Sequence, residues 1–447
     1  MFAPDAQSYW ISRKIPTDQF LLYCFADPTD GLDEIRAALL GRAALIPDLR
    51  VKVGEIPLRA DYPHWVPMAV DGGHVRVHGS GPRSWERCRD AVAGLLTSRL
   101  DPSESPWRLH LFGPVQGAPR CEEGPAVVAV LQVAHALADG TRASEIARAL
   151  FSEEAPAPTE DRPWRPALAF AAAAARLPVQ VAQTIRRAGP AHRTHRQLER
   201  DTEAGLVPAK PPSLPKLSTN ARPNEYRTIR TVVLDAADLR GAGTSVTVGA
   251  MTAISLALTR YLGLHGIAIE EGLAAEVTVA KSGPALARNH FRNLAVDLFP
   301  DVEDPRERAE SIAESLQTRR LRGDHPAREA EDRAMAAIPA VLVRRGVEQF
   351  DFTAVPDTVT GHTVVSSVAR GPADLTLGGA AVRFTAGFPA LSQFMGLTHG
   401  VHGIGDTVTL SIVTSPSVMT DVDTYEDLLR AAVAEVRDAA AVGRPAE

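Results

Sequence analysis

The chain has 447 residues, of which 45% are hydrophobic and 23% charged. This composition is typical of a soluble globular protein and excludes a mainly disordered chain. The formal net charge is −6, which argues against a nucleic-acid partner, because nucleic-acid-binding domains usually carry a basic face. Three scattered cysteines are too few for a disulfide scaffold or a four-cysteine zinc site, so we expect a reduced, cytoplasmic protein.

The first half of the chain alternates strand and helix patterns. Strands are predicted at 20–25, 107–112 and 126–133, and helices at 32–44, 85–100 and from 140 to about 150. The run AVVAVLQV at 126–133 is continuously apolar, which is typical of a strand buried on both faces. Thr29 or Asp30 is expected to cap the helix that begins at Leu32.

A proline-rich segment divides the chain nearly in half. Five prolines lie between residues 208 and 223, and such segments are extended and resist packing into a core. We therefore predict an N-terminal lobe at 1–195, a crossover linker at 196–224 and a C-terminal lobe at 225–447.

The second half repeats the alternation of strands and helices. Strands are predicted at 228–234, 274–279, 294–299, 363–368 and 407–413, and helices at 246–262, 304–320 and 424–440. Because both halves alternate in this way, the predicted fold class is α/β.

Most familiar catalytic motifs are absent from the sequence, including GxSxG, GxxxxGK[ST], HExxH and GxGxxG. One compact string remains, HxxxDG, which runs from His135 to Gly140. It falls where the buried strand gives way to a helix, and a loop in that position can hold a side chain rigidly in a cleft. His135 is therefore a candidate site residue, and the alternative is a hydrogen-bonded core histidine.

The segment VLQVAHALADGTRASEIARALF at 130–151 resembles the HHxxxDG segment of the wax ester synthase/diacylglycerol acyltransferase family. That family belongs to a superfamily of coenzyme A-dependent acyltransferases and peptide-synthetase condensation domains. Further similar segments lie in the family's order along the chain, at 106–111 before this motif and at 219–220, 287–300, 364–372 and 408–423 after it. The resemblance implies two chloramphenicol-acetyltransferase-like lobes that form a V around a central tunnel.

The sequence departs from the family pattern at several positions. Ala134 stands in place of the first histidine of HHxxxDG, and Gly249-Ala250 stands in place of an asparagine-aspartate pair. Ser366-Ser367 replaces the SN of the SNVPGP segment. The second histidine and the DG of the first motif are retained, so the chain resembles a divergent member.

The resemblance implies a role for each residue of the motif. His135 is the general base that takes a proton from an acceptor hydroxyl, and histidine suits this role because its pKa lies near neutrality. Asp139 holds the loop through a salt bridge to an arginine, or it caps the following helix. Gly140 allows a close backbone approach or a positive φ, and the N–H groups of the helix that begins there favour a developing oxyanion.

The second half offers weaker candidates for the site. Asn289, Ser366 and Ser367 are expected to line it, and the alternative is that they are polar strand ends. His399 and His402 form an HxxH pair, but no convincing third ligand accompanies them, so we predict no metal.

The implied reaction moves an acyl group from acyl-CoA, or from an acyl carrier protein, to an alcohol acceptor and releases the thiol. Acyl-CoA is then a co-substrate, and no other cofactor is expected. Two alternatives stay open. One is a condensation-type enzyme that forms amides or esters, and the other is a non-catalytic acyl-ligand-binding homologue, which the changes at Ala134 and Gly249-Ala250 motivate.

The stretch 166–185 is rich in alanine, but Arg176 and Pro178 interrupt it, and a membrane span needs about 20 mostly apolar residues. We interpret it as a surface or interface helix. Five arginines follow between 186 and 200. They are expected to form a solvated helix face, and they can also attract the phosphates of coenzyme A or an anionic membrane. The first ten residues show no secretory signal, so we expect a cytoplasmic protein with possible peripheral membrane contact.

Overall fold

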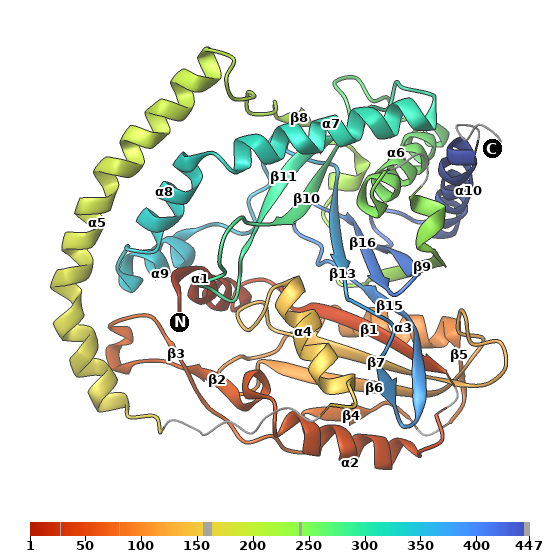
Figure 1. The fold of residues 1–447 in the computed structure, drawn as a ribbon, viewed down its shortest axis with the longest axis horizontal. Helices are drawn as coiled ribbons and strands as arrows, with labels where there is room; N and C mark the ends of the chain where they lie inside the picture. Colours follow the sequence, from red (N-terminus) through yellow and green to blue (C-terminus); the bar gives the residue numbers. More distant parts are fainter. Residues whose placement is uncertain (27, 80, 155–162, 241–243, 442–447) are drawn as a thin grey trace.

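The computed structural model describes residues 1–447 except 27, 80, 155–162, 241–243 and 442–447 (Figure 1). Two large β-sheets, each covered by helices, form its framework. The first has the strand order β14-β15-β1-β7-β6-β4 with β5 beside β6, and the second has the order β11-β10-β13-β16-β17-β9. The α/β fold class is confirmed.

The first sheet takes strands from both halves of the chain. Its members are β1 (Gln19–Ala26), β4 (Val75–Val77), β5 (Arg83–Ser84), β6 (Trp107–Gln116), β7 (Ala126–Val133), β14 (Thr376–Leu377) and β15 (Ala380–Gly387). The strand β7 lies between β1 and β6 and is buried at every position, as its continuous apolar run predicts. Because β15 pairs antiparallel with β1, residues from the C-terminal half complete this sheet.

Helices cover both faces of the first sheet. One core cluster joins α2 (Leu32–Ala43) and α4 (Gly140–Phe151) to the sheet, and a second cluster on the other face contains α3 (Trp85–Leu95). The prediction that Thr29 or Asp30 caps α2 is wrong. Gly31 occupies the cap position, and its N–H bonds to the Glu34 carboxylate three residues later.

The second sheet consists of strands from the C-terminal half alone. Its strands are β9 (Thr228–Asp235), β10 (Ala274–Ala280), β11 (Phe291–Asp297), β13 (Thr363–Ala369), β16 (Leu397–Ile404) and β17 (Thr407–Thr414). Three helices pack on one of its faces: α6 (Val246–Leu264), α7 (Pro305–Gly323) and α10 (Val422–Ala441). The strand β11 begins at Phe291, three residues before the predicted start, and β16 was not predicted, because two glycines interrupt its apolar alternation.

Gly249 on α6 explains one departure from the family pattern. A Cβ atom at this position would lie 2.0 Å from the backbone oxygen of Leu239. Side-chain carbons do not approach a backbone oxygen so closely, so the helix packs against residues 236–239 only with glycine here. The asparagine of the family pattern does not fit at Gly249 in this packing.

Several smaller elements complete the described chain. These are α1 (Ala3–Ser12), α8 (Pro326–Met335), α9 (Ala340–Gln349), the strand pairs β2 (Val51–Gly54) with β3 (His64–Pro67) and β8 (Leu214–Pro215) with β12 (Thr358–Val359), and the 3-10 turns η1 (Pro47–Arg50), η2 (Pro57–Arg59), η3 (Ser218–Asn220) and η4 (Ala236–Leu239). The helices α1, α8 and α9 were not predicted from the sequence.

The longest helix, α5 (Pro166–Glu203), runs along the outside of the molecule and forms the outer arc at the left of Figure 1. It continues through Pro178 and Pro190, so the lobe boundary expected at residue 195 falls inside a helix. The interpretation of 166–185 as a surface helix is confirmed, since only Ala173 and Leu198 of α5 are buried.

Candidate active site

His135 lies where the two sheets meet. It follows β7 in the short loop before α4, and its side chain is half-buried. Its Nδ1 atom lies 2.6 Å from Oδ1 of Asn289. Asn289 lies two residues before the start of β11, a strand of the second sheet. The structure therefore brings together two predicted site residues that are 154 positions apart in the sequence.

The orientation of the Asn289 amide follows from its other contacts. Its Nδ2 donates to the backbone oxygen of His135 at 2.8 Å and to Oδ1 of Asp5 at 3.1 Å. Both partners are acceptors, so Oδ1 of Asn289 must be the atom that faces His135. An amide oxygen cannot donate, and therefore Nδ1 of His135 carries the proton. The Nε2 atom is left with a free lone pair, as a general base requires.

Asp5 on α1 fixes Asn289 in turn. Its side chain is 1% exposed, its Oδ1 accepts the backbone N–H of Asn289 at 2.9 Å, and its Oδ2 accepts the N–H of Arg288 at 3.2 Å. Burial raises the pKa of the Asp5 carboxyl, and the hydrogen bonds from Arg288 and Asn289 oppose that rise. The result is a chain of contacts from α1 through Asn289 to His135.

Sequence reasoning missed Asp5 because no element was predicted before the strand at 20–25. Ala6, Tyr9 and Trp10 are buried on one side of α1 and repeat at helical spacing. That short pattern was the available signal, and it places Asp5 on the same buried side of the helix.

Asp139 caps α4, as one of its two interpretations predicted. Its Oδ1 accepts the N–H of Arg142 at 3.0 Å, and its Oδ2 accepts the N–H of His290 at 3.0 Å. It therefore ties the loop of His135 to the segment that carries Asn289. Among the described residues, no arginine forms the alternative salt bridge to Asp139, and the nearby guanidinium groups of Arg142 and Arg288 pair with Asp48 at 3.0 and 2.8 Å.

Gly140 permits a close approach and has no positive φ. It is the first residue of α4, and a Cβ atom there would lie 3.2 Å from Cγ2 of Val368 on β13. The ring of Phe291 packs against that of His135, with the ring centroids 5.3 Å apart. The imidazole is thus held by an aromatic ring and by an amide.

Ser366 and Ser367 lie on β13, and their successive side chains point to opposite faces of the sheet. The hydroxyl of Ser367 lies 2.7 Å from that of Thr247. Across the part of the chain that the structure describes, neither serine is hydrogen-bonded to His135. The prediction that they line the site stays a prediction.

His399 and His402 do not form a metal pair. Both lie on β16, and positions three apart in a strand point to opposite faces. His399 binds the hydroxyls of Thr363 and Tyr425 at 2.8 and 2.9 Å. Within the described residues, no group of three or more histidine, cysteine, aspartate or glutamate side chains is arranged to hold a metal ion.

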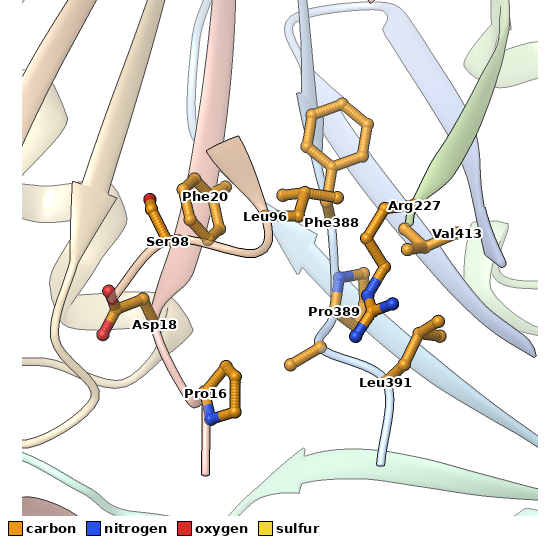
Figure 2. A pocket seen from close by; sticks show the side chains of 11 residues that line it. Pro16, Asp18, Phe20, Leu96, Ser98, Arg227, Phe388, Pro389, Leu391 and Val413 are labelled. Atoms are coloured by element: carbon orange, nitrogen blue, oxygen red, sulfur yellow. The ribbon is translucent and has the colours of Figure 1, made fainter. Parts of the chain in front are cut away.

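A narrow cavity lies between the two sheets, and Figure 2 shows side chains from both sides facing each other across it. It has room for about one water molecule, with a volume of about 10 Å³. Its lining residues are Pro16, Asp18, Phe20, Leu96, Ser98, Arg227, Phe388, Pro389, Ala390, Leu391 and Val413. Burial raises the pKa of Asp18 to about 6.

Two segments of the chain match models of one known family. Residues 21–249 match the family model of the wax ester synthase/diacylglycerol acyltransferase catalytic domain. The chain belongs to this family. Residues 288–437 match the C-terminal domain of the same family, and the predicted resemblance is therefore confirmed. The family also confirms the prediction that the chain is an acyltransferase.

Solved structures share this fold at low sequence identity. The wax ester synthase/diacylglycerol acyltransferase from Marinobacter aquaeolei VT8 is 17% identical, with 98% of each chain covered and a TM-score of 0.63. The first condensation domain of the calcium-dependent antibiotic synthetase is 15% identical, with 97% and 96% coverage and a TM-score of 0.56. A variant starter condensation domain of rhizomide synthetase, solved with C8-CoA and Leu-SNAC, is 13% identical, with 98% and 94% coverage and a TM-score of 0.54.

Proposed function

We propose that this enzyme transfers an acyl group from acyl-CoA to an alcohol, with His135 as the general base. The observation that carries the proposal is the contact between Nδ1 of His135 and Oδ1 of Asn289 at 2.6 Å. This contact leaves the Nε2 lone pair of His135 available to a substrate, and Asn289 and Phe291 hold the imidazole in place.

The proposed step balances without any further reactant. Nε2 of His135 takes the proton of the acceptor hydroxyl as its oxygen attacks the thioester carbonyl carbon. The tetrahedral intermediate then breaks its carbon–sulfur bond, and the imidazolium returns the proton to the departing thiolate. The products are an ester and free coenzyme A, so no metal or redox cofactor is required by the balance.

Two observations support acyl-CoA as the donor. The family to which the chain belongs is defined by an acyltransferase catalytic domain, and a structural neighbour was solved in complex with C8-CoA. An acyl carrier protein presents the same thioester and is a second possible donor. The alcohol acceptor follows from the ester-forming family rather than from a contact in the structure.

The test measures thiol release from a series of acyl-CoA donors with pooled alcohols, for the wild type and for His135→Ala. We expect wild-type release with ester formation, and a loss of about 10²–10⁴-fold in the variant. The matched control is His192→Ala, which alters an exposed histidine on α5. Equal rates in the wild type and His135→Ala would overturn the general-base assignment.

The same assay separates the two alternatives. Product with pooled amines in place of alcohols would assign the chain to amide formation. Binding of acyl-CoA without any thiol release, from either coenzyme A or a carrier protein, would indicate a non-catalytic binder, the alternative that Ala134 and Gly249-Ala250 motivated.

A further inference from the structure

The outer helix α5 is unusual because its apolar residues face away from the protein. By length and composition, α5 and α6 are the two helices in the described chain that are apolar enough to cross a membrane. Of the most apolar 18-residue window of α6, 72% is buried in the core, whereas only 6% of the corresponding window of α5 is buried. The apolar part of α6 is explained by the fold, and that of α5 is not.

Polar side chains hold α5 to the body of the protein. Gln180 donates to Asp61 at 3.1 Å, the Thr184 hydroxyl donates to the Ala337 oxygen at 2.7 Å, and Arg187 donates to the Arg333 oxygen at 3.0 Å. These three positions are spaced by four and three residues, so they share one face of the helix. The inward face of α5 is therefore polar.

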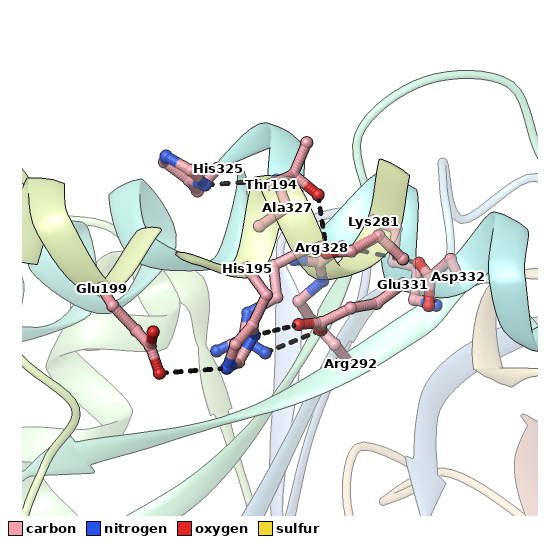
Figure 3. A network of polar contacts seen from close by, with 11 residues as sticks. Thr194, His195, Glu199, Lys281, Arg292, His325, Ala327, Arg328, Glu331 and Asp332 are labelled. Carbon is pink, nitrogen blue, oxygen red and sulfur yellow. Dashed lines mark hydrogen bonds and ion pairs between the residues drawn. The ribbon is translucent and has the colours of Figure 1, made fainter. Parts of the chain in front are cut away.

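The contacts continue toward the end of the helix. Figure 3 shows the ring of His195 on α5 meeting Glu331 on α8, with Nδ1 and Oε1 2.9 Å apart, and its Nε2 lies 3.6 Å from Glu199. Arg328 approaches the same Glu331 at 2.8 Å. These contacts hold α5 against the protein surface from Gln180 to His195.

The outward face carries the apolar side chains. Leu168, Ala171, Ala174, Pro178, Val181 and Ile185 follow one another at intervals of three or four residues. Leu168, Val181 and Ile185 are 59%, 44% and 71% exposed. An ordinary surface helix turns its apolar stripe toward the core, so α5 has the reverse arrangement.

The charge around this stripe has one sign. Residues 163–198 contain six arginines and no aspartate or glutamate. Arg186, Arg193 and Arg196 are exposed, and none of these guanidinium groups has an ion pair or hydrogen bond with another described residue. The acidic residues of α5 follow only from Glu199 onward.

We propose that the outward face of α5 binds the surface of a membrane that contains anionic phospholipids. The apolar stripe enters the boundary between headgroups and acyl chains, while the arginines contact lipid phosphates. An anionic bilayer offers both an apolar layer for the stripe and negative charge for the arginines. A second copy of the chain would bring the same arginines to the contact, and like charges repel one another. The helix lies on the bilayer and does not span it, because its inner face stays bound to the protein.

The test is flotation of the full-length protein with vesicles of phosphatidylcholine, with and without phosphatidylglycerol. We expect binding to the mixed vesicles, at least about tenfold weaker binding to phosphatidylcholine alone, and release at high salt. Arg193→Gln with Arg196→Gln should weaken binding by about 10–30-fold, since each cation near an anionic surface contributes about fivefold. Val181→Gln with Ile185→Gln should weaken it by about tenfold or more.

Matched controls carry the same changes elsewhere on the surface. Leu264→Gln alters an exposed apolar residue at the end of α6, and Arg306→Gln with Arg437→Gln removes two exposed cations. These variants should bind like the wild type. Binding is measured without catalysis, so failure of this proposal is distinguishable from failure of the acyltransferase mechanism.

Two results would overturn the proposal. One is equal binding by the control and α5 variants. The other is absence of vesicle binding together with a dimer, measured by sedimentation, that Val181→Gln with Ile185→Gln converts to monomer. The second outcome would assign the face to contact between copies of the chain.

Discussion

Two carboxyl groups are buried near the junction of the sheets, and they are bound in different ways. Asp5 is 1% exposed and Asp18 is 4% exposed. Both oxygens of Asp5 accept N–H groups from the segment that carries Asn289. Asp18 uses only Oδ2, which accepts from the Leu100 N–H at 2.8 Å and from the Gln132 side chain at 2.7 Å, and its Oδ1 has no partner in the described structure.

The difference shows what a buried carboxyl group does in each place. When both oxygens are bound, removing the group leaves several buried N–H donors without partners, which costs about 1–3 kcal/mol for each. When one carboxylate oxygen has no hydrogen-bond partner, burying its negative charge lowers the stability of the folded state. Burial raises the pKa of both carboxyl groups, so each charge has a cost in the folded state. Asp5 is a positioning residue for Asn289 and His135 through both of its oxygens, whereas one oxygen of Asp18 stays without a partner in the described structure.

Among changes to the contacts of Asp5, Asn289→Ala should have the largest effect on activity, because it removes the side chain that links Asp5 to His135. The ring of His135 then loses the acceptor that fixes its Nδ1 proton. Partners of this kind typically contribute about 10–100-fold to activity, so kcat should fall by about that factor with little change in KM.

The control for this variant is Asn293→Ala, which alters an exposed asparagine on β11, four residues after Asn289. Circular dichroism should show both variants folded. An Asn289→Ala enzyme with wild-type kcat would mean that the contact with His135 has no part in catalysis.

Asp5→Ala should have a smaller effect of the same kind. Asn289 keeps its bond to the His135 backbone but loses its second anchor, so we expect kcat to fall by about tenfold. Asp5→Asn retains an oxygen that can accept from Asn289 and should recover most of that loss. A purely structural role of α1 predicts no such rescue, and Gln7→Ala on the exposed side of α1 is the matched control.

The sequence pattern predicted the part of the site that lies within one continuous segment, from β7 to the start of α4. The apolar run of β7 and the turn at 134–139 were predicted, and the cap at Asp139 was one of two predicted alternatives. Asn289 entered only through the family resemblance. Its contact with His135 joins two segments that follow or precede strands of different sheets. The periodicity of neither segment indicates that the two side chains lie together in the fold.

The rest of the fold shows the same limit. Alternation indicated strands in both halves, but β15 was not among them. That β15 joins the first sheet depends on its register with β1, which no local pattern indicates. The sequence indicated a surface or interface helix over 166–185, and Gly189-Pro190 is a usual place for a helix to end. The helix continues there because contacts with α8, such as that of His195 with Glu331, hold the following turns.

The variant Asp18→Asn tests the difference between the two carboxyl groups most directly, because we expect it to stabilise the protein. The side chain is almost fully buried, and burial raises the pKa of its carboxyl from the usual 3.8 to about 6. Between these two values the folded state binds more protons than the unfolded state. Stability from this group is therefore present below about pH 4 and is lost as the pH rises through 6.

Asparagine keeps an oxygen for the Leu100 N–H and the Gln132 side chain, and it places no charge beside the unpartnered position. We expect Asp18→Asn to raise the free energy of unfolding by about 1 kcal/mol at pH 7.5, because the avoided cost of the charge exceeds the lost strength of its hydrogen bonds. Urea unfolding at several pH values measures the difference, which should shrink toward pH 4. A variant less stable than the wild type at pH 7.5 would show that Asp18, like Asp5, is fully bound when ionised, for example by a water molecule in the adjoining cavity.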